Sequence, residues 1–276
     1  MKNLKMFCIT LNPKHLKIIQ DLNYIPVGLG NKNFNTNWVT DKGLFEISHK
    51  NPFYGEYTFH YSIWKNDLVK DDKEWIGFCQ YRKYWAIEEN KNHEISYKEF
   101  KSSVMQLIPD KFSEYEAVLV NEIYINQFRL SKFIKHNIKK MILNPILFFD
   151  KNKRNIKFHF DMMHGDGNLE KAIEMLDLDE RKDFREFVKN NTSFNPYNMF
   201  ICKSKKILFD YYNSVFPWLE RCEKIFGFEN LKGYGLQRIY GFLAERYLSY
   251  WFKKYTKYTV LPIIFKDIGD FNYKAL

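Results

Sequence analysis

The sequence predicts an α/β protein built on a Rossmann-type mixed sheet flanked by helices, with a helix-rich C-terminal half. A strand-like run, a short helix and a second strand-like run open the chain within residues 5–30, as in a parallel βαβ unit. Apolar runs typical of buried strands recur up to about residue 125. Beyond residue 150 the apolar residues mostly follow the period of helices.

The elements of the first half follow in order. "KMFCITLN" is the first expected strand, "PKHLKIIQDLN" a short helix, and "YIPVGLG" a strand with its turn. Residues 31–55 are polar and irregular, and a loop of that length inside a compact domain is usually functional or mobile. Aromatic residues at 57, 61 and 64 have the spacing of a helix face. A strand in "WIGFCQYRKYW", a helix at 96–109 and a strand in "YEAVLVNEIYI" complete this half.

Helices dominate the second half. The expected elements are a helical pair at 168–190, a strand running into a helix at 198–226, a long aromatic helix at 234–255 and a closing strand at 258–268. No repeat and no Gly/Ser/Pro-rich linker interrupts the chain, so residues 1–276 are predicted to form one domain. Its halves are about 1–125 and 126–276.

Charge and cysteine content limit the function classes. The net charge of +10 suits an anionic partner: a nucleic acid, a phosphorylated small molecule or an anionic membrane surface. No block of five like charges and no nucleic-acid-binding motif is present, so no nucleic-acid partner is predicted. Four separated cysteines among apolar residues indicate buried thiols in a reducing compartment. With no signal peptide and no apolar run near ~20 residues, a cytoplasmic protein is expected.

The first candidate site is the end of the buried run at 75–79, where Gln80, Tyr81, Arg82 and Lys83 follow. Ligands of α/β folds bind beyond the carboxyl ends of parallel strands. Arginine offers phosphate a bidentate fork, lysine a point charge and tyrosine a stacking face. The alternative is a strand that ends in a solvated basic turn.

The second candidate lies at a helix start near residue 52, with Ser48 before it and Tyr54 and Glu56 on its first turn. Lys50 and Asn51 precede that helix, and anions bind where free N–H groups and the helix dipole converge. The alternative, compatible with phosphate binding, is ordinary capping by Asn51 with Pro52 at the first helical position.

The third candidate is "HFDMMHGDGN", which places His159, Asp161, His164 and Asp166 within eight positions. These residue types can hold a divalent metal. The segment can equally supply a carboxylate base or form a polar loop.

The fourth candidate is "QRIYGFLAERYL", a helix built for the core that nevertheless carries charge. Arg238 and Glu245 lie two helical turns apart, and Arg246 follows. Charged residues in apolar surroundings are paired or functional. Glu245 is therefore either the partner in a structural ion pair or a catalytic carboxylate.

Taken together, these pieces resemble a family of bacterial glycosyltransferases of capsule and O-antigen assembly, long catalogued as a domain of unknown function, which includes galactofuranosyltransferases. The resemblance spans about residues 4–265. It rests on "ISHKNPFYGEYTFHYSIWKN", "IGFCQYRKYW", "PYNMFICKSKKILFDYYNSVFPWLERCEK" and "QRIYGFLAERYLSYW". "NMFI" and "FLAER" match the family as they stand, which carries over Asn198, Glu245 and Arg246.

The chain departs from the family pattern at several positions. Gln80 stands where the family usually has histidine, Lys83 where it has arginine, and Glu116 where it has aspartate. "MHGDG" replaces "HHIxD" but keeps His164 and Asp166. These departures put a metal role for position 80 in doubt, and they allow for a changed donor or acceptor.

The resemblance implies a GT-A-like fold in which residues 1–125 bind a UDP-sugar and residues 126–276 bind an oligosaccharide or lipid-linked glycan acceptor. Inverting transfer to a growing polysaccharide is expected. Glu245 or Asp166 is the expected base, and His164 with Asp166 the candidate ligands of Mn²⁺ or Mg²⁺. The residues expected to bind the nucleotide-sugar are Thr10, Asn12, Lys50, Asn51, Gln80, Tyr81, Arg82, Lys83, Asn198, Arg238 and Arg246.

Two further expectations remain. If the changes at Gln80 and Lys83 mark lost activity, the chain is instead a non-catalytic carbohydrate-binding subunit of a polysaccharide assembly complex. The segment "SKFIKHNIKKMILNPILFF" resembles a basic amphipathic helix at the inner face of the cytoplasmic membrane, and its alternative is an apolar face packed on the core. Its basic residues are Lys132, Lys135, Lys139 and Lys140.

Overall fold

The computed structural model describes residues 2–70, 74–89, 95–128, 142 and 145–271. The strands are β1 (Lys2–Thr10), β2 (Ile25–Gly28), β3 (Val39–Thr40), β4 (Trp75–Gln80), β5 (Lys83–Trp85), β6 (Leu107–Ile108), β7 (Ala117–Val120), β8 (Ile123–Tyr124), β9 (Ser193–Phe194), β10 (Phe200–Cys202), β11 (Tyr258–Leu261) and β12 (Ile263–Phe265). The helices are α1 (Leu16–Asp21), α2 (Asn51–Tyr54), α3 (Tyr57–Asn66), α4 (Tyr97–Ser103), α6 (Ile146–Phe149), α7 (Ile156–His164), α8 (Asn168–Ile173), α9 (Leu178–Asn190), α10 (Lys205–Phe226), α11 (Tyr234–Gln237) and α12 (Ile239–Tyr255).

The main sheet has the strand order β11–β7–β10–β4–β1–β2–β3. β1 pairs in parallel with both β2 and β4, and β11 pairs in parallel with β7. β10 runs antiparallel to its two neighbours, β4 and β7. The predicted Rossmann-type mixed sheet is therefore confirmed, and so is the βαβ unit that opens the chain.

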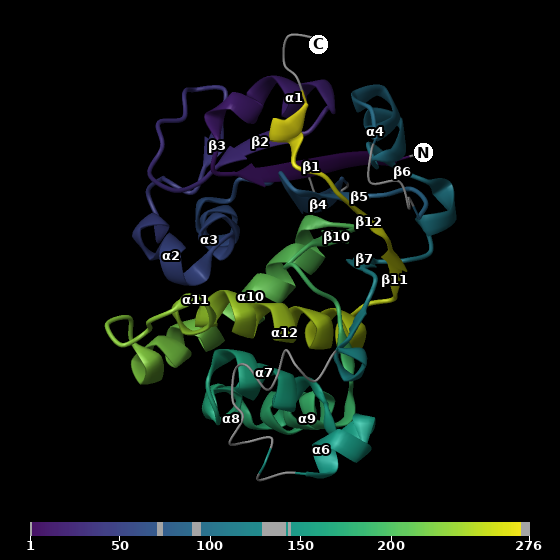
Figure 1. Ribbon diagram of the computed structural model, residues 1–276. Helices are drawn as coiled ribbons and strands as arrows, with labels where there is room; N and C mark the ends of the chain where they lie inside the picture. Colours follow the sequence, from purple (N-terminus) through teal and green to yellow (C-terminus); the bar gives the residue numbers. More distant parts are fainter. Residues whose placement is uncertain (1, 71–73, 90–94, 129–141, 143–144, 272–276) are drawn as a thin grey trace.

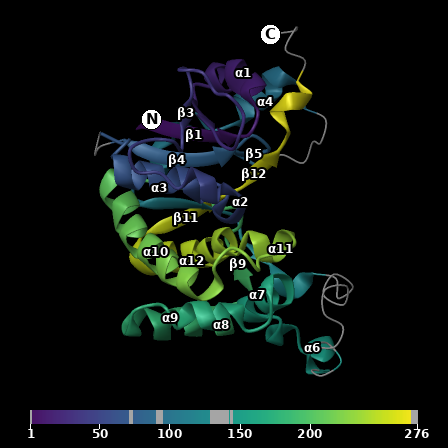
Figure 2. The same cartoon turned by 90° about the vertical axis from the view of Figure 1, so that its left-hand side faces the viewer.

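Helices cover both faces of this sheet (Figure 1; Figure 2). Successive side chains of a strand point to opposite faces. In β1, Phe7 and Ile9 accordingly join the core formed with α3, α10 and α12, whereas Met6 and Cys8 join the core formed with α1 and α4. A strand buried on both faces needs apolar residues at every position, which explains why "MFCI" is a continuous apolar run.

The C-terminal half adds a second helical layer, in which α7 and α9 lie against the side of α12 that faces away from the sheet (Figure 1). Side chains fix where these helices start: Asn155 accepts the N–H of Phe158 (2.9 Å) at α7, and Ser204 accepts that of Ile207 (3.3 Å) at α10. The predicted helix-rich half is confirmed. Strands β10, β11 and β12 of this half nevertheless join the main sheet, so the two sequence halves share one sheet.

Some predicted boundaries are wrong. The stretch 75–85 is a hairpin and not one strand, because Gln80 pairs with Lys83 across a two-residue turn of Tyr81 and Arg82. The stretch 258–268 holds two strands separated by Pro262, which lacks a backbone donor: β11 pairs with β7, and β12 pairs with β5. The helix expected at 96–109 ends at Ser103, and the one expected at 234–255 is divided at Arg238.

The proposed basic amphipathic segment, with its four lysines, lies mostly outside the described residues. Its described C-terminal part includes α6 and leaves Ile142, Ile146 and Phe149 exposed by 67%, 53% and 87%. Among the helices the structure describes, none has both the length and the apolar character that a membrane span requires.

Candidate active site

The parallel strands β1, β2 and β4 end together, and the chain leaves the sheet there at Thr10, Gly28 and Gln80. β2 lies on one side of β1 and β4 on the other, so the strand order reverses at β1. Backbone hydrogen bonds close this edge: Leu29 N donates to Thr10 O (3.0 Å), and Tyr81 N donates to Ile9 O (3.0 Å). Such a switch point is where α/β proteins bind ligands.

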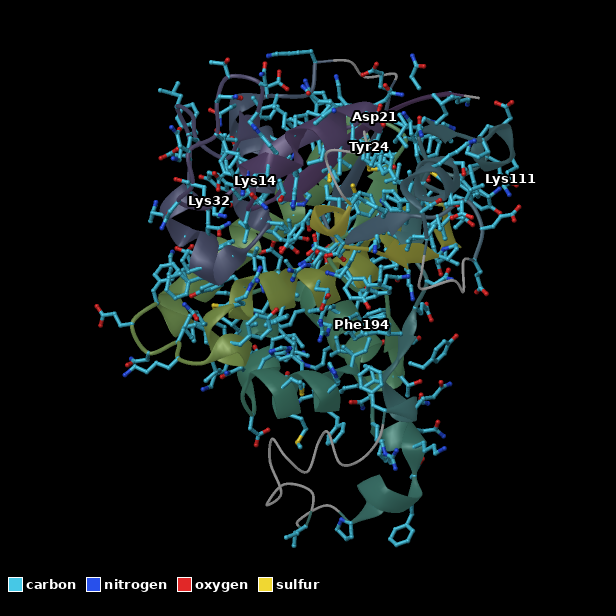
Figure 3. All side chains as sticks on the ribbon, turned by 45° about the horizontal axis from the view of Figure 1, so that its top comes forward. Lys14, Asp21, Tyr24, Lys32, Lys111 and Phe194 are labelled. Carbon is cyan, nitrogen blue, oxygen red and sulfur yellow. The ribbon has the colours of Figure 1, made fainter. Side chains whose placement is uncertain are left out.

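An imidazole organises the β1 side of this edge. The Thr10 hydroxyl lies 2.9 Å from His15 Nδ1, and Asn12 Nδ2 lies 3.3 Å from His15 Nε2. Burial lowers the pKa of His15, and Lys32 lowers it further, whereas Asp267 opposes the shift. Sequence analysis missed His15, although it follows directly after a strand end. Figure 3 labels Lys14 and Lys32, which come from the segments that follow β1 and β2.

The turn after β4 carries the predicted cation Arg82. Its side chain is 61% exposed, and its Nε donates to Asp267 Oδ2 at 2.7 Å. This hydrogen bond raises the pKa of Arg82. The guanidinium also lies 4.8 Å from the centre of the Tyr81 ring, whose other neighbour is His15 at 5.3 Å. Arg82 therefore stands at the sheet edge, held by one carboxylate and open to solvent.

A second, more buried cluster is centred on Glu56, which was not among the predicted site residues. Glu56 Oε1 accepts from Asn198 Nδ2 at 2.9 Å and from Gln80 Nε2 at 3.3 Å. Glu56 Oε2 lies 3.4 Å from Arg238 Nη2. Lys83 Nζ donates to Gln80 Oε1 at 2.8 Å. The fold thus gathers four predicted residues around one unpredicted carboxylate.

The backbone before β10 is held in an uncommon conformation beside this cluster. Tyr197 and Asn198 have φ values of 77° and 54°, a region that non-glycine residues seldom occupy. Tyr197 N donates to Glu245 Oε1 at 2.6 Å, and Gln80 Nε2 donates to Tyr197 O at 3.0 Å. Strain of this kind persists where the surroundings fix it, and it is common at functional sites.

Glu245 does not pair with Arg238, the partner that the two-turn spacing predicted. Its Oε2 contacts Arg246, which is only 2% exposed. The Arg246 guanidinium lies 3.9 Å from the centre of the Phe194 ring, labelled in Figure 3, and its Nη2 lies 3.2 Å from His159 Nδ1. Burial lowers the pKa of Arg246, and the Glu245 carboxylate opposes that shift. These groups form a buried ion pair beneath the candidate site.

Lys50 and Asn51 do not join the Glu56 cluster directly. Lys50 Nζ donates to both oxygens of Glu223 in α10 (2.7 and 2.8 Å). The expected cap is also wrong, because Asn51 is the first residue of α2 and its Nδ2 donates to Gly55 O at 3.0 Å. Asn51 therefore fixes the turn that presents Glu56.

The residues of "HFDMMHGDGN" face different partners. His159 lies beside Arg246, and Asp161 Oδ2 accepts from Lys157 Nζ at 2.7 Å. His164 Nδ1 lies 3.0 Å from Gly235 O. Over the described ranges, no three His, Cys, Asp or Glu residues are grouped as a metal site would need. A Mn²⁺ or Mg²⁺ ion here would therefore take most of its ligands from the diphosphate and from water.

A hollow of about 300 Å³ lies on the far side of Tyr197, at the carboxyl ends of β7 and β11. Tyr197 and Phe265 line it with their rings 5.7 Å apart, and Glu89, Asn121 and Glu122 supply polar groups. A larger hollow of about 920 Å³ lies at the opposite edge of the sheet, where Trp75 begins β4, and none of the predicted site residues lines it.

Comparisons with known proteins bear on the family and the fold of the chain. The profile of the family described as "Domain of unknown function (DUF4422)" matches residues 8–257. A solved structure titled as the apo form of the WbbM bifunctional glycosyltransferase matches with a TM-score of 0.68 and 18% sequence identity, over 95% of this chain and 45% of that one. The chain thus spans less than half of that protein. The predicted α/β class is confirmed, because the sheet and its flanking helices match a glycosyltransferase fold. No curated protein matches the chain.

Proposed function

The chain belongs to the family DUF4422, and from this premise we propose that it is a glycosyltransferase that moves a sugar from a UDP-sugar to a glycan acceptor. The observation that carries the proposal is the charge at the β1–β4 switch point. Arg82 and Lys83 stand at the strand end where α/β folds bind nucleotides, and Lys32 adds a positive charge from the loop after β2. Fold similarity to a glycosyltransferase supports the reaction class.

Two chemical needs follow from this reaction. As the anomeric C–O bond breaks, negative charge grows on the departing diphosphate, and cations placed there stabilise it. Arg82 and Lys83 are our candidates, because both follow the end of strand β4. A carboxylate must also take the proton of the acceptor hydroxyl. Glu245 and Asp166 remain the sequence-based candidates for that base.

We propose that about residues 1–125 bind the donor and that about 126–276 contribute most of the acceptor side. The hollow beside Tyr197 is our candidate acceptor site, and both halves line it: Tyr197, Pro262 and Phe265 come from the second half, and Glu89, Asn121 and Glu122 from the first. Aromatic rings pack against the C–H faces of sugars, and carboxylates accept hydroxyl hydrogen bonds. The carboxylate of Glu89 disfavours an anionic ligand there and suits a neutral glycan, whereas Glu122 is already paired with Lys253 and Ser193.

The finer assignments rest on the family resemblance. We propose UDP-galactofuranose as the first donor to test, an inverting reaction, and an oligosaccharide or lipid-linked glycan of capsule or O-antigen assembly as acceptor. A cytoplasmic enzyme acting on a lipid-linked glycan benefits from peripheral membrane contact. The exposed Ile142, Ile146 and Phe149 support such a contact.

A panel of UDP-sugars in furanose and pyranose forms tests the proposal by thermal shift and by UDP release. A donor that binds only the folded state raises the melting temperature. UDP binding with sugar-dependent UDP release supports the transferase. Glycan binding without any UDP binding would support the alternative, a non-catalytic carbohydrate-binding subunit.

A further inference from the structure

We infer that Glu56 is the catalytic carboxylate that takes the proton of the acceptor hydroxyl. The assignment rests on the proposed glycosyl transfer. In that step the acceptor oxygen bonds to the anomeric carbon, the bond from that carbon to the diphosphate oxygen breaks with its electron pair, and the proton goes to Glu56. UDP leaves with the negative charge, so atoms and charge balance.

The local fold presents Glu56 at the site edge. Glu56 directly precedes α3, and Gly55 before it has φ 58°. A side chain at Gly55 would meet Arg238, since a Cβ built there lies 2.1 Å from Arg238 Nη2. Glycine therefore allows the guanidinium to reach Glu56 Oε2 across the turn. Asn51 Nδ2, bound to Gly55 O, holds the same turn from the other side.

The charges around Gln80 are arranged as the reaction requires. The Gln80 amide oxygen accepts from Lys83 Nζ at 2.8 Å, and its amide nitrogen lies 3.3 Å from Glu56 Oε1. One neutral amide thus separates a cation from a carboxylate. Lys83 can meet the diphosphate as it gains charge, while Glu56 meets the hydroxyl as it loses a proton.

Glu245 is less suited to accept a proton. Its two oxygens are engaged by Tyr197 N and by the buried Arg246. Protonation would remove the negative charge that compensates a guanidinium out of contact with water, which is strongly unfavourable. Glu56 instead faces Arg238, whose side chain is 35% exposed, across 3.4 Å. Proton uptake at Glu56 therefore leaves no deeply buried charge uncompensated.

An unused acceptor lies next to Glu56. Asn198 is only 7% exposed and its Nδ2 donates to Glu56 Oε1, but no group in the described part of the chain donates to its Oδ1. Buried polar atoms are normally hydrogen-bonded, so the missing donor is expected from a ligand. A sugar hydroxyl is such a donor. Its hydrogen bond to Asn198 would place the acceptor against the carboxylate.

The test uses the full chain with Glu56→Gln, Glu56→Asp and Glu245→Gln. UDP is the binding probe, and UDP release from UDP-galactofuranose and UDP-galactose is the activity readout, with water or added glycan as acceptor. We expect Glu56→Gln to bind UDP within about twofold of wild type while UDP release falls at least about 100-fold, the usual range for loss of a general base. Glu245→Gln serves as a comparison of stability: it leaves the buried Arg246 without its compensating charge, so its melting temperature should fall.

The pH profile separates a base from a positioning residue. Glu56→Asp keeps a carboxylate, so it should retain partial activity and the acidic limb of the wild-type profile, whereas Glu56→Gln should lose that limb. Wild-type UDP release by Glu56→Gln, or equal loss of UDP binding and release, overturns the assignment. If Glu56→Gln does not fold, a Glu56→Asp profile without an acidic limb overturns it. Absence of UDP binding by the wild type instead removes the proposed function, and the role of Glu56 with it.

Discussion

His60 should make the fold sensitive to mild acid. This α3 residue is fully buried, with its ring 4.4 Å from Phe78 and 5.7 Å from Phe200. Its Nδ1 lies 2.6 Å from the Tyr212 hydroxyl, and its Nε2 has no hydrogen-bond partner among the described residues. Burial lowers the pKa of His60 from 6.5 to about 3. The imidazole therefore stays neutral in the folded state at pH values where the unfolded chain binds a proton.

The sign and size of the effect follow from linkage. A folded-state pKa below the unfolded value means that stability is complete above pH 6.5 and is lost as the pH falls towards the folded pKa of about 3. Each pH unit in that window costs about 1.4 kcal/mol. From pH 7 to pH 5, His60 alone should lower the free energy of unfolding by about 2 kcal/mol.

Urea unfolding of wild type and His60→Asn at pH 7 and pH 5 measures this loss. Asparagine keeps a polar atom near the Tyr212 hydroxyl but does not titrate, and the other histidines contribute equally to both proteins. The wild type should lose about 2 kcal/mol more than the variant between the two pH values. Equal losses would show that the imidazole is not held neutral in the folded state, and would refute the predicted link between His60 and acid sensitivity.

Three further predictions concern ligands. Arg82→Ala should weaken UDP binding about 30-fold by calorimetry, because a charge-assisted phosphate contact is worth about 2 kcal/mol. Asp267→Asn, which removes the charge paired with Arg82 but keeps the guanidinium, should not weaken it, and unchanged affinity in Arg82→Ala would refute the role. Phe265→Ala should raise the acceptor KM by roughly 3- to 10-fold through the loss of an aromatic contact, while UDP affinity stays constant. A matching loss of UDP affinity would place the hollow beside Tyr197 on the donor side. The wild-type chain should sediment with anionic vesicles at low salt. Because each lysine near the membrane surface contributes about 1 kcal/mol to binding, binding should weaken in high salt and when four lysines are replaced by glutamine. Failure of the wild type to sediment would refute the membrane proposal. The four lysines are Lys132, Lys135, Lys139 and Lys140.

The sequence predicts the architecture well because burial on two faces leaves a strong local signal. Strands such as β1 are continuously apolar, and α3 shows its aromatic face at helical spacing. A reversal of chain direction within an apolar run leaves a weaker signal in the sequence. The turn residues Tyr81 and Arg82 are neither glycine nor asparagine, the residues that usually mark a hairpin turn. The turn is therefore recognised only from the pairing of Gln80 with Lys83 in the structure.

The candidate site was predictable only in pieces. Sequence position places Gln80 and Lys83 after a strand and Asn198 before another, but it does not show that Gln80 and Asn198 bind Glu56 or that Lys83 binds Gln80. The available signal for Glu56 was an acidic residue directly after Gly55, at the junction of an irregular segment and a helix. A long-range contact such as that of Asn198 with Glu56, which are 142 positions apart, leaves no periodicity in the chain.

The late position of β10 in the sequence also determines when the sheet can be completed during synthesis. Residues 1–80 hold β1, β2, β3 and β4, and β5 then pairs at Gln80, but Ile76 and Gly77 on the outer edge of β4 lack their partner strand until β10 emerges. An unpaired apolar edge recruits other chains. Glu56 is synthesised early, but its partners Asn198 and Arg238 are synthesised only later. A nascent chain arrested before residue 200 should therefore depend on chaperones, and truncated forms that end there should aggregate although they contain the whole β1–β4 switch point.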